Sequence, residues 1–138
     1  MPRTSAPRLQ LEPTSSRTTV LDGGWWPRTT DPAIELPAII DALGPARGTV
    51  THILLSTGDW DMPHPRRLMV GGRTVRLGWF TSQPTGLITL ICDFNHDRFD
   101  LLVIPPKSAS GPAAKAMRAA SDTGNTRHTP DLLAAIAR

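Results

Sequence analysis

The stretch RLMVGGRTVRLGWF, residues 67–80, is the clearest structural element in the sequence. Two runs of strand-forming residues flank Gly71 and Gly72, and consecutive glycines permit the positive φ angles of a two-residue hairpin turn. In the second run, apolar side chains alternate with others: Val75, Leu77 and Trp79 against Thr74, Arg76 and Gly78. The stretch therefore predicts an antiparallel hairpin in which Arg67 lies opposite Arg76.

Further strands are predicted on both sides of this hairpin. Apolar runs bounded by turn residues predict strands over 50–56, 87–92 and 98–104. Upstream, residues 31–43 predict a helix with Asp31 as its N-cap, a bend at Pro37, and an end at Gly44-Pro45. Residues 19–26 predict a short extended piece that breaks at Gly23-Gly24.

These elements predict an α+β fold. The sheet is expected to be an antiparallel meander of about four or five strands, either strongly curved or barrel-like. One early helix precedes it, and short C-terminal helices follow it. The expected organisation is a flexible N-terminal segment at 1–18 with an edge strand at 8–12, a globular domain at 19–106, and an Ala/Ser-rich tail at 107–138 with weak helices.

Composition limits the classes of protein to which the chain can belong. Its 138 residues suit one domain, and its net charge is +3. Thirteen of the 15 basic residues are arginine, but they form no block of the kind that marks a nucleic-acid-binding tail. A single cysteine, Cys92, excludes a disulfide within the chain. The sequence has no apolar run of membrane-spanning length and no secretory signal pattern, which predicts a cytoplasmic protein without a membrane partner.

Four segments together resemble a known family. They are LDGGWWPRTTDPAIELP (21–37), RRL (66–68), GRTVRLGWF (72–80) and RFDLLVIPP (98–106). In this order they are similar to the actinobacterial domain of unknown function 5994 family, over about residues 8–106, with the tail from Lys107 onward outside the resemblance. The resemblance implies no activity, cofactor or catalytic residue.

The sequence carries no recognisable catalytic or metal-binding motif. It lacks a Gly-x-Ser-x-Gly elbow, and Cys92 with His96 is interpreted as a buried small hydrophobe near a turn, a Cys-His nucleophile being the alternative. His52, Asp59, Asp61 and His64 fall within 13 residues, but their spacing matches no zinc motif. Neither glycine pair has the lysine of a phosphate-binding loop. We therefore expect no catalytic residue, no metal and no cofactor.

The predicted pairing of Arg67 with Arg76 requires an explanation, because like charges directly opposite one another destabilise a strand pair. One explanation is an internal carboxylate, for which Asp100 is the candidate because it alternates with Phe99 and Leu101. The other is an anion-binding patch, since paired guanidinium groups suit phosphate or carboxylate. Arg28 is expected to join such a patch.

The tryptophans raise a related question. Trp25 and Trp26 are adjacent, and neighbouring side chains of a strand point to opposite faces. One ring is expected in the core, and the other in a second apolar cluster or against a partner. Trp79 is predicted to be a core residue, and Trp60, in the polar loop GDWDMPHP (58–65), an exposed aromatic.

These features favour a non-catalytic binding or regulatory module. Its partner is expected to be a protein or a small anionic ligand, contacted by Trp25, Trp26, Arg28, Trp60, Arg67 and Arg76. One alternative is nucleic-acid binding through the same groups, and another is a small enzyme whose residues converge only in the fold. A homodimer through an exposed edge at 98–104 is also compatible with the sequence.

Overall fold

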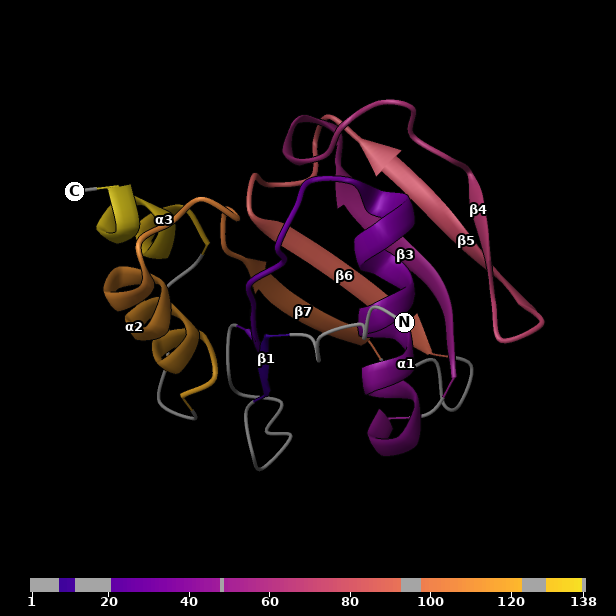
Figure 1. Cartoon of the computed structure of the whole chain (residues 1–138), viewed down its shortest axis with the longest axis horizontal. Coiled ribbons are helices and arrows are strands. Elements are labelled where there is room, and N and C mark those ends of the chain that lie inside the picture. Colours follow the sequence, from indigo (N-terminus) through magenta and orange to yellow (C-terminus); the bar gives the residue numbers. More distant parts are fainter. Residues whose placement is uncertain (1–7, 12–20, 48, 93–97, 123–128, 138) are drawn as a thin grey trace, which may run out of the picture.

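A mixed sheet of seven strands forms the centre of the computed structural model (Figure 1). The structure describes residues 8–11, 21–47, 49–92, 98–122 and 129–137. The strands are β1 (Leu9–Leu11), β2 (Gly23–Trp25), β3 (Val50–Ser56), β4 (Arg67–Val70), β5 (Arg73–Phe80), β6 (Leu87–Cys92) and β7 (Arg98–Val103). The helices are α1 (Pro32–Arg47), α2 (Ser110–Ala120) and α3 (Thr129–Ala137), with a 3-10 turn at Thr57–Asp59. None of the helices in these ranges combines the length and the hydropathy needed to cross a membrane.

The α+β class is confirmed, but the meander order is wrong. The strand order is β1-β2-β7-β6-β3-β5-β4, and the pairs β2·β7 and β3·β5 are parallel. The sheet has seven strands instead of four or five, and it ends at β1 and β4 without closing into a barrel. The segment 98–104 is not an exposed edge, because β7 lies between β2 and β6. A dimer through that edge is therefore excluded.

The hairpin 67–80 forms with the predicted register. Gly71 and Gly72 have φ angles of 59° and 77°, as a two-residue turn of this kind requires. Arg67 pairs with Arg76 across the two strands. The hairpin does not follow its predecessor in a meander, however, because β5 inserts next to β3 in parallel and leaves β4 at the edge.

Helix α1 begins as predicted and continues further than predicted. The Asp31 carboxylate accepts the Ala33 backbone N–H at 3.0 Å, the geometry of an N-cap. The helix does not end at Gly44-Pro45 and continues to Arg47. Pro37 and Pro45 lack the N–H groups that would bond the carbonyls of Ala33 and Asp41, four residues earlier. Both of those residues are exposed, so water can bond their carbonyl groups.

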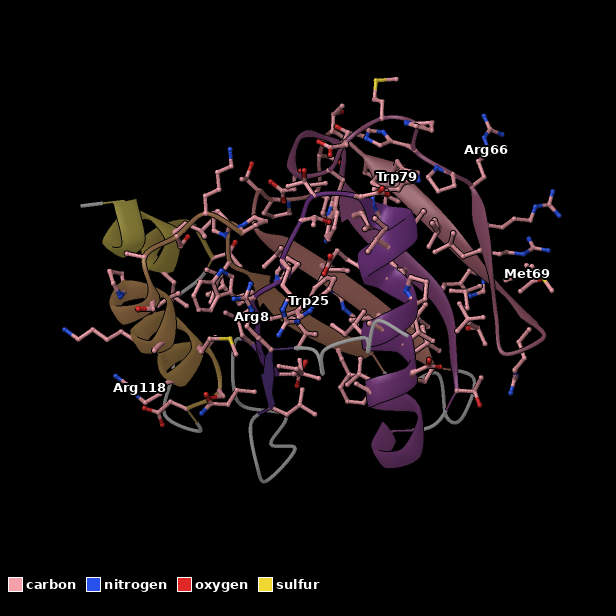
Figure 2. All side chains as sticks on the ribbon, in the orientation of Figure 1. Arg8, Trp25, Arg66, Met69, Trp79 and Arg118 are labelled. Carbon is pink, nitrogen blue, oxygen red and sulfur yellow. The ribbon has the colours of Figure 1, made fainter. Side chains whose placement is uncertain are left out.

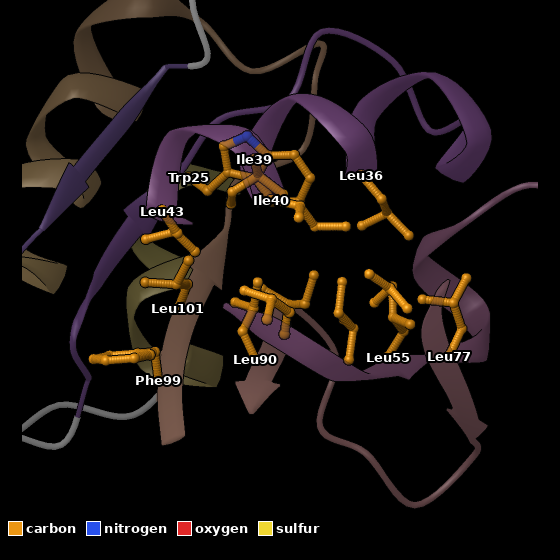
Figure 3. Packing of buried hydrophobic residues seen from close by; sticks show 14 of the residues in the cluster. Trp25, Leu36, Ile39, Ile40, Leu43, Leu55, Leu77, Leu90, Phe99 and Leu101 are labelled. Atoms are coloured by element: carbon orange, nitrogen blue, oxygen red, sulfur yellow. The ribbon is translucent and has the colours of Figure 1, made fainter. Parts of the chain in front are cut away.

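The main core lies between α1 and one face of the sheet. Figure 3 shows the apolar side chains of α1 directed at those of the strands; among the labelled residues are Leu36, Ile39, Ile40 and Leu43 from α1, facing Leu55, Leu77, Leu90, Phe99 and Leu101. The sheet residues alternate along their strands with side chains that point to the other face. Every second position of β5, including Thr74 and Arg76, therefore faces away from α1.

A second core covers part of that other face. Helices α2 and α3 lie at the β1–β2–β7 end of the molecule (Figure 1). Their buried residues pack with side chains of the sheet end; the cluster comprises Leu21, Leu102, Ile104, Ala113, Ala116, Ala120 and Leu132. The segment expected to be a weakly docked tail thus contributes buried side chains to the fold.

Two adjacent glycines allow close packing where the sequence suggested a break. Gly23 and Gly24 lie inside β2 and are buried. A Cβ at Gly24 would lie 3.2 Å from the Cα and from the Sδ of Met117, so the missing side chain admits α2 to the sheet. The two glycines serve close packing of the strand, and not a turn.

We therefore expect Gly24→Ala to lower the free energy of unfolding by about 1–3 kcal/mol, because the added methyl group forces α2 away from β2. Gly58→Ala is the matched control, since a Cβ there meets no atom within 4 Å. Urea unfolding followed by tryptophan fluorescence measures both. Equal stability of the two variants would contradict this account of the α2–β2 contact.

Candidate functional site

Half of the sheet face opposite α1 is left uncovered. Helices α2 and α3 cover it at the β2–β7 end, where Leu102 and Ile104 are buried. At the other end, the strands β3, β5 and β4 carry exposed side chains on this face. Figure 2 shows Arg66 and Met69 extending from that end of the molecule, with Arg118 of α2 at the opposite end. This uncovered half is called the open face below.

The open face contains a basic hollow of about 650 Å³. Its lining includes Arg66, Arg67 and Arg76, together with His52 of β3, and none of the described residues that line it is acidic. The described residues place no hydrogen-bond or ion-pair partner on any of these three guanidinium groups. Three cations without a partner in the described part of the chain thus line one concave surface.

Pairing in the ladder brings two of these cations close together. The Leu77 N–H bonds the Arg66 carbonyl at 2.8 Å, which makes the adjacent Arg67–Arg76 pair a non-hydrogen-bonded one. The Cα atoms of such pairs approach to about 4.5 Å, closer than those of hydrogen-bonded pairs. The two guanidinium groups therefore leave the sheet side by side.

The internal carboxylate expected to offset this repulsion lies elsewhere. Asp100 is on β7, separated from β5 by β6 and β3. Its carboxylate accepts the Thr89 hydroxyl at 2.6 Å and pairs with Arg98 at 3.3 Å. The prediction that Asp100 neutralises Arg67 and Arg76 is wrong because it assumed a meander order.

Two exposed apolar side chains also belong to β4 and β5, the strands that carry Arg67 and Arg76. Met69 is 67% exposed and Phe80 is 45% exposed. The Phe80 ring packs over Gly78, where an added Cβ would lie 2.8 Å from the ring and 3.3 Å from Leu54. Sequence reasoning missed Phe80 because it ends the strand outside the alternation of Val75, Leu77 and Trp79. The open face thus combines positive charge with aromatic and aliphatic surface.

Trp25 and Trp60 lie in the main core and not on a surface. Trp25 is 1% exposed and Trp60 is 6% exposed, and their rings stack with centroids 5.6 Å apart. The expectation of an exposed Trp60 is wrong, because the loop after β3 folds back until the Asp61 N–H bonds the Thr30 carbonyl at 2.9 Å. Neither ring is part of the basic hollow.

Trp26 points to the other side of the chain and packs against the second core. Its indole N–H faces the carbonyls of Pro105 and Pro106 at 3.2 and 3.3 Å, and the Arg8 guanidinium lies 3.8 Å from its ring centroid. The adjacent tryptophans therefore have two separate apolar environments. Sequence reasoning missed Arg8, whose partner is 18 residues away.

Arg28 belongs to this neighbourhood and not to the basic hollow. It does not line the hollow, and its backbone N–H bonds the Glu35 carboxylate at 3.2 Å. Burial and then the charge of Arg28 lower the pKa of Arg8, which the Glu35 carboxylate opposes. Of the six predicted site residues, the structure brings only Arg67 and Arg76 together at the hollow.

The loop of residues 57–66 is fastened to the end of the sheet. The His64 ring stacks on Trp79 with centroids 4.1 Å apart, and one of its ring nitrogens lies 3.0 Å from the Trp60 carbonyl. The Trp79 indole N–H donates to the Pro65 carbonyl at 2.7 Å. Trp79 is half-buried against the main core. His64 therefore packs against the body of the protein and is not simply a solvated loop residue.

The four residues considered as metal ligands lie apart. Within the described ranges, no three His, Cys, Asp or Glu side chains are grouped closely enough to hold a metal ion. Asp59 is half-buried and accepts the Gly86 backbone N–H at 2.7 Å. Burial raises the pKa of Asp59 above its ordinary value of 3.8, and the bond from Gly86 opposes that rise. Cys92 is buried, and His96 lies outside the described residues.

Comparison with known proteins identifies a family without an assigned function. The model of a family described as "Family of unknown function (DUF5994)" matches residues 8–120, which is most of the chain. The match extends beyond residue 106 and includes α2. No curated protein and no solved structure matches the chain.

We expect Trp60→Ala to lower the free energy of unfolding by about 3–5 kcal/mol, because it removes a stacked ring from the main core. Phe80→Ala is the control, since an aromatic ring that is 45% exposed contributes less to stability. Denaturant unfolding monitored by circular dichroism compares them. A loss for Trp60→Ala no larger than for Phe80→Ala would show that Trp60 is not a core residue.

A second prediction concerns pH. The folded state holds the proton of Asp59 up to a higher pH than the unfolded state does, because its pKa is raised above 3.8. The protonated Asp59 therefore stabilises the folded state fully at pH values below the pKa that this group has in the unfolded chain. That stabilisation is lost as the pH rises through the higher pKa of the folded state. Unfolding measured from pH 3 to pH 7 should show the wild-type chain losing stability relative to Asp59→Asn in that window. A difference independent of pH would contradict the burial of this carboxyl group.

Proposed function

We propose that this chain, which belongs to the family of unknown function DUF5994, is a non-catalytic binding module whose open face takes an anionic partner. The partner presents phosphate or carboxylate groups, carried either by a small ligand or by a protein. Its contacts would be Arg66, Arg67 and Arg76 in the basic hollow, with His52 beside them. The proposed setting is the cytoplasm, because proteins of that compartment rarely carry disulfides and the single cysteine of this chain, Cys92, cannot form one within it.

One observation supports the proposal above all others: the convergence of unpaired guanidinium groups. Arg67 and Arg76 are neighbours in the ladder, and the described part of the chain places no carboxylate in the lining of the hollow that they share with Arg66. Like charges at this separation repel, and an anion between them converts repulsion into attraction. Two guanidinium forks side by side also match the geometry of phosphate and carboxylate oxygens.

A second candidate function is supported by Phe80. An exposed aromatic ring next to cationic side chains on a sheet face is the arrangement on which single-stranded nucleic acids stack their bases. Phe80 is at the end of the strand that carries Arg76, and its ring is 45% exposed. Under this alternative the arginines would contact the backbone phosphates and Phe80 a base.

The first test measures anion binding directly. Titration with pyrophosphate, followed by nuclear magnetic resonance of the backbone amides, should shift signals of β4 and β5. In the double variant Arg67→Gln/Arg76→Gln we expect the affinity to fall about tenfold or more, because charge-assisted hydrogen bonds contribute about 1.5–3 kcal/mol each. Arg118→Gln removes an exposed arginine at the far end of the molecule and serves as the control. An equal loss of affinity in the control would show that net charge alone explains the binding, and it would refute a specific anion site in the basic hollow.

The second test separates the two candidates. Binding of a labelled oligothymidylate should weaken steeply with salt and lose affinity in Phe80→Ala if the open face binds single strands. Pyrophosphate binding, by contrast, should be insensitive to Phe80→Ala. If the oligonucleotide binds no tighter than pyrophosphate and Phe80→Ala changes neither, the nucleic-acid candidate fails and the small-anion or protein candidate remains.

A further inference from the structure

A smaller pocket of about 200 Å³ lies where the parallel strands β2, β7 and β3 end. The chain leaves each of these strands at the same end of the sheet, and their exit segments form the pocket walls. The lining residues are Pro27, Thr29, Thr30, Gly58, Asp59, Trp60, Val103, Pro105 and Pro106. None of them lines the basic hollow, so this pocket is a distinct site.

Hydrogen bonds from outside the pocket hold its apolar walls in place. The Trp26 indole N–H faces the carbonyls of Pro105 and Pro106, and the Arg8 guanidinium donates to the Pro27 carbonyl at 2.9 Å. Three prolines are stiff residues, and here their backbone positions are fixed as well. A ligand would bind to a preformed surface, and ordering the pocket walls would cost little free energy.

One charged group is available inside these walls. Among the lining residues that the structure describes, Asp59 is the one that ionises. Its Oδ2 accepts the Gly86 N–H, whereas the described residues place no partner on its Oδ1. No buried side-chain oxygen or nitrogen of the described chain lacks a partner, so Oδ1 must be accessible. The accessible oxygen can therefore accept a hydrogen bond from a ligand.

We propose that this pocket binds a small primary ammonium group with a short apolar chain. The Asp59 carboxylate would accept a charge-assisted hydrogen bond from the ammonium, and the prolines with the edge of Trp60 would cover the chain. Cavities of about 150 Å³ hold a molecule the size of benzene, so about 200 Å³ holds an alkylamine of similar size. An anionic ligand is disfavoured here because it would face the Asp59 carboxylate.

The test compares probes of one shape and different charge. Isotope-labelled protein is titrated with n-butylamine, n-butanol and butyrate at neutral pH, and the indole N–H signal of Trp60 is followed. We expect butylamine to bind at least tenfold more tightly than either of the others. If butanol binds as tightly as butylamine, or if butylamine does not shift the Trp60 signal, the proposal is overturned. This comparison uses the wild-type protein alone.

A pair of variants then locates the charge. Asp59→Asn keeps an oxygen that can accept the Gly86 N–H while it removes the negative charge, and Asp61→Asn changes the exposed aspartate two residues away. We expect Asp59→Asn to weaken butylamine binding at least tenfold and Asp61→Asn to leave it unchanged. An equal effect of both variants would indicate general electrostatic attraction and would overturn the site.

The ammonium group can belong to a free amine or to a lysine side chain of another protein. A lysine whose α-amino and carboxyl groups are both blocked distinguishes these two sources. If N-acetyl-lysine methylamide binds as well as butylamine, the pocket accepts a lysine side chain. If only butylamine binds, the ligand is a free small amine, and both results support the proposed chemistry. The pyrophosphate titration of the basic hollow is independent of this experiment, so either site can fail without the other.

Discussion

The stacking of Trp25 on Trp60 is the contact on which the arrangement of both candidate sites depends. Trp25 comes from β2, and Trp60 comes from the loop that leaves β3, so their contact closes this loop over the end of the sheet. Because the loop is fastened there, Asp59 at its start lines the small pocket. Arg66 at its end reaches the basic hollow. One buried aromatic pair thus positions a residue of each surface, and the hairpin register adds Arg67 and Arg76 to the hollow.

The two surfaces differ in shape and in charge, which suggests a division of roles. The hollow is broad and lined by arginine, whereas the pocket is narrow and carries a single carboxyl group among prolines. The sheet provides both because its two ends are covered differently. Helices α2 and α3 cover the β2–β7 end of one face, and the face at β3, β5 and β4 stays open. Because these helices cover only part of the face, an exposed surface remains there, while the main core on the opposite face stays intact.

The sequence predicted local structure well and long-range pairing poorly. The register of the hairpin was predictable because a two-residue glycine turn determines which residues pair. The insertion of β5 beside β3 was not, since an alternating pattern is the same for parallel and antiparallel neighbours. Arg67 and Arg76 were found through the hairpin register. Trp60 was misplaced because its polar neighbours Asp59 and Asp61 predict an exposed loop, and only the contact with Trp25 buries its ring.

The parallel pairing of β2 with β7 has a consequence for the order in which the chain folds. These two strands join segments that are far apart in the sequence, and the Asp22 carboxylate accepts the Asp100 backbone N–H across 78 positions. During synthesis β2 can pair with β1 at once, but it cannot pair with β7 until residue 103 has been added. The hairpin β4–β5 can form in the meantime from local contacts alone. The joining of β1 and β2 to the rest of the sheet is therefore a late, high-contact-order event.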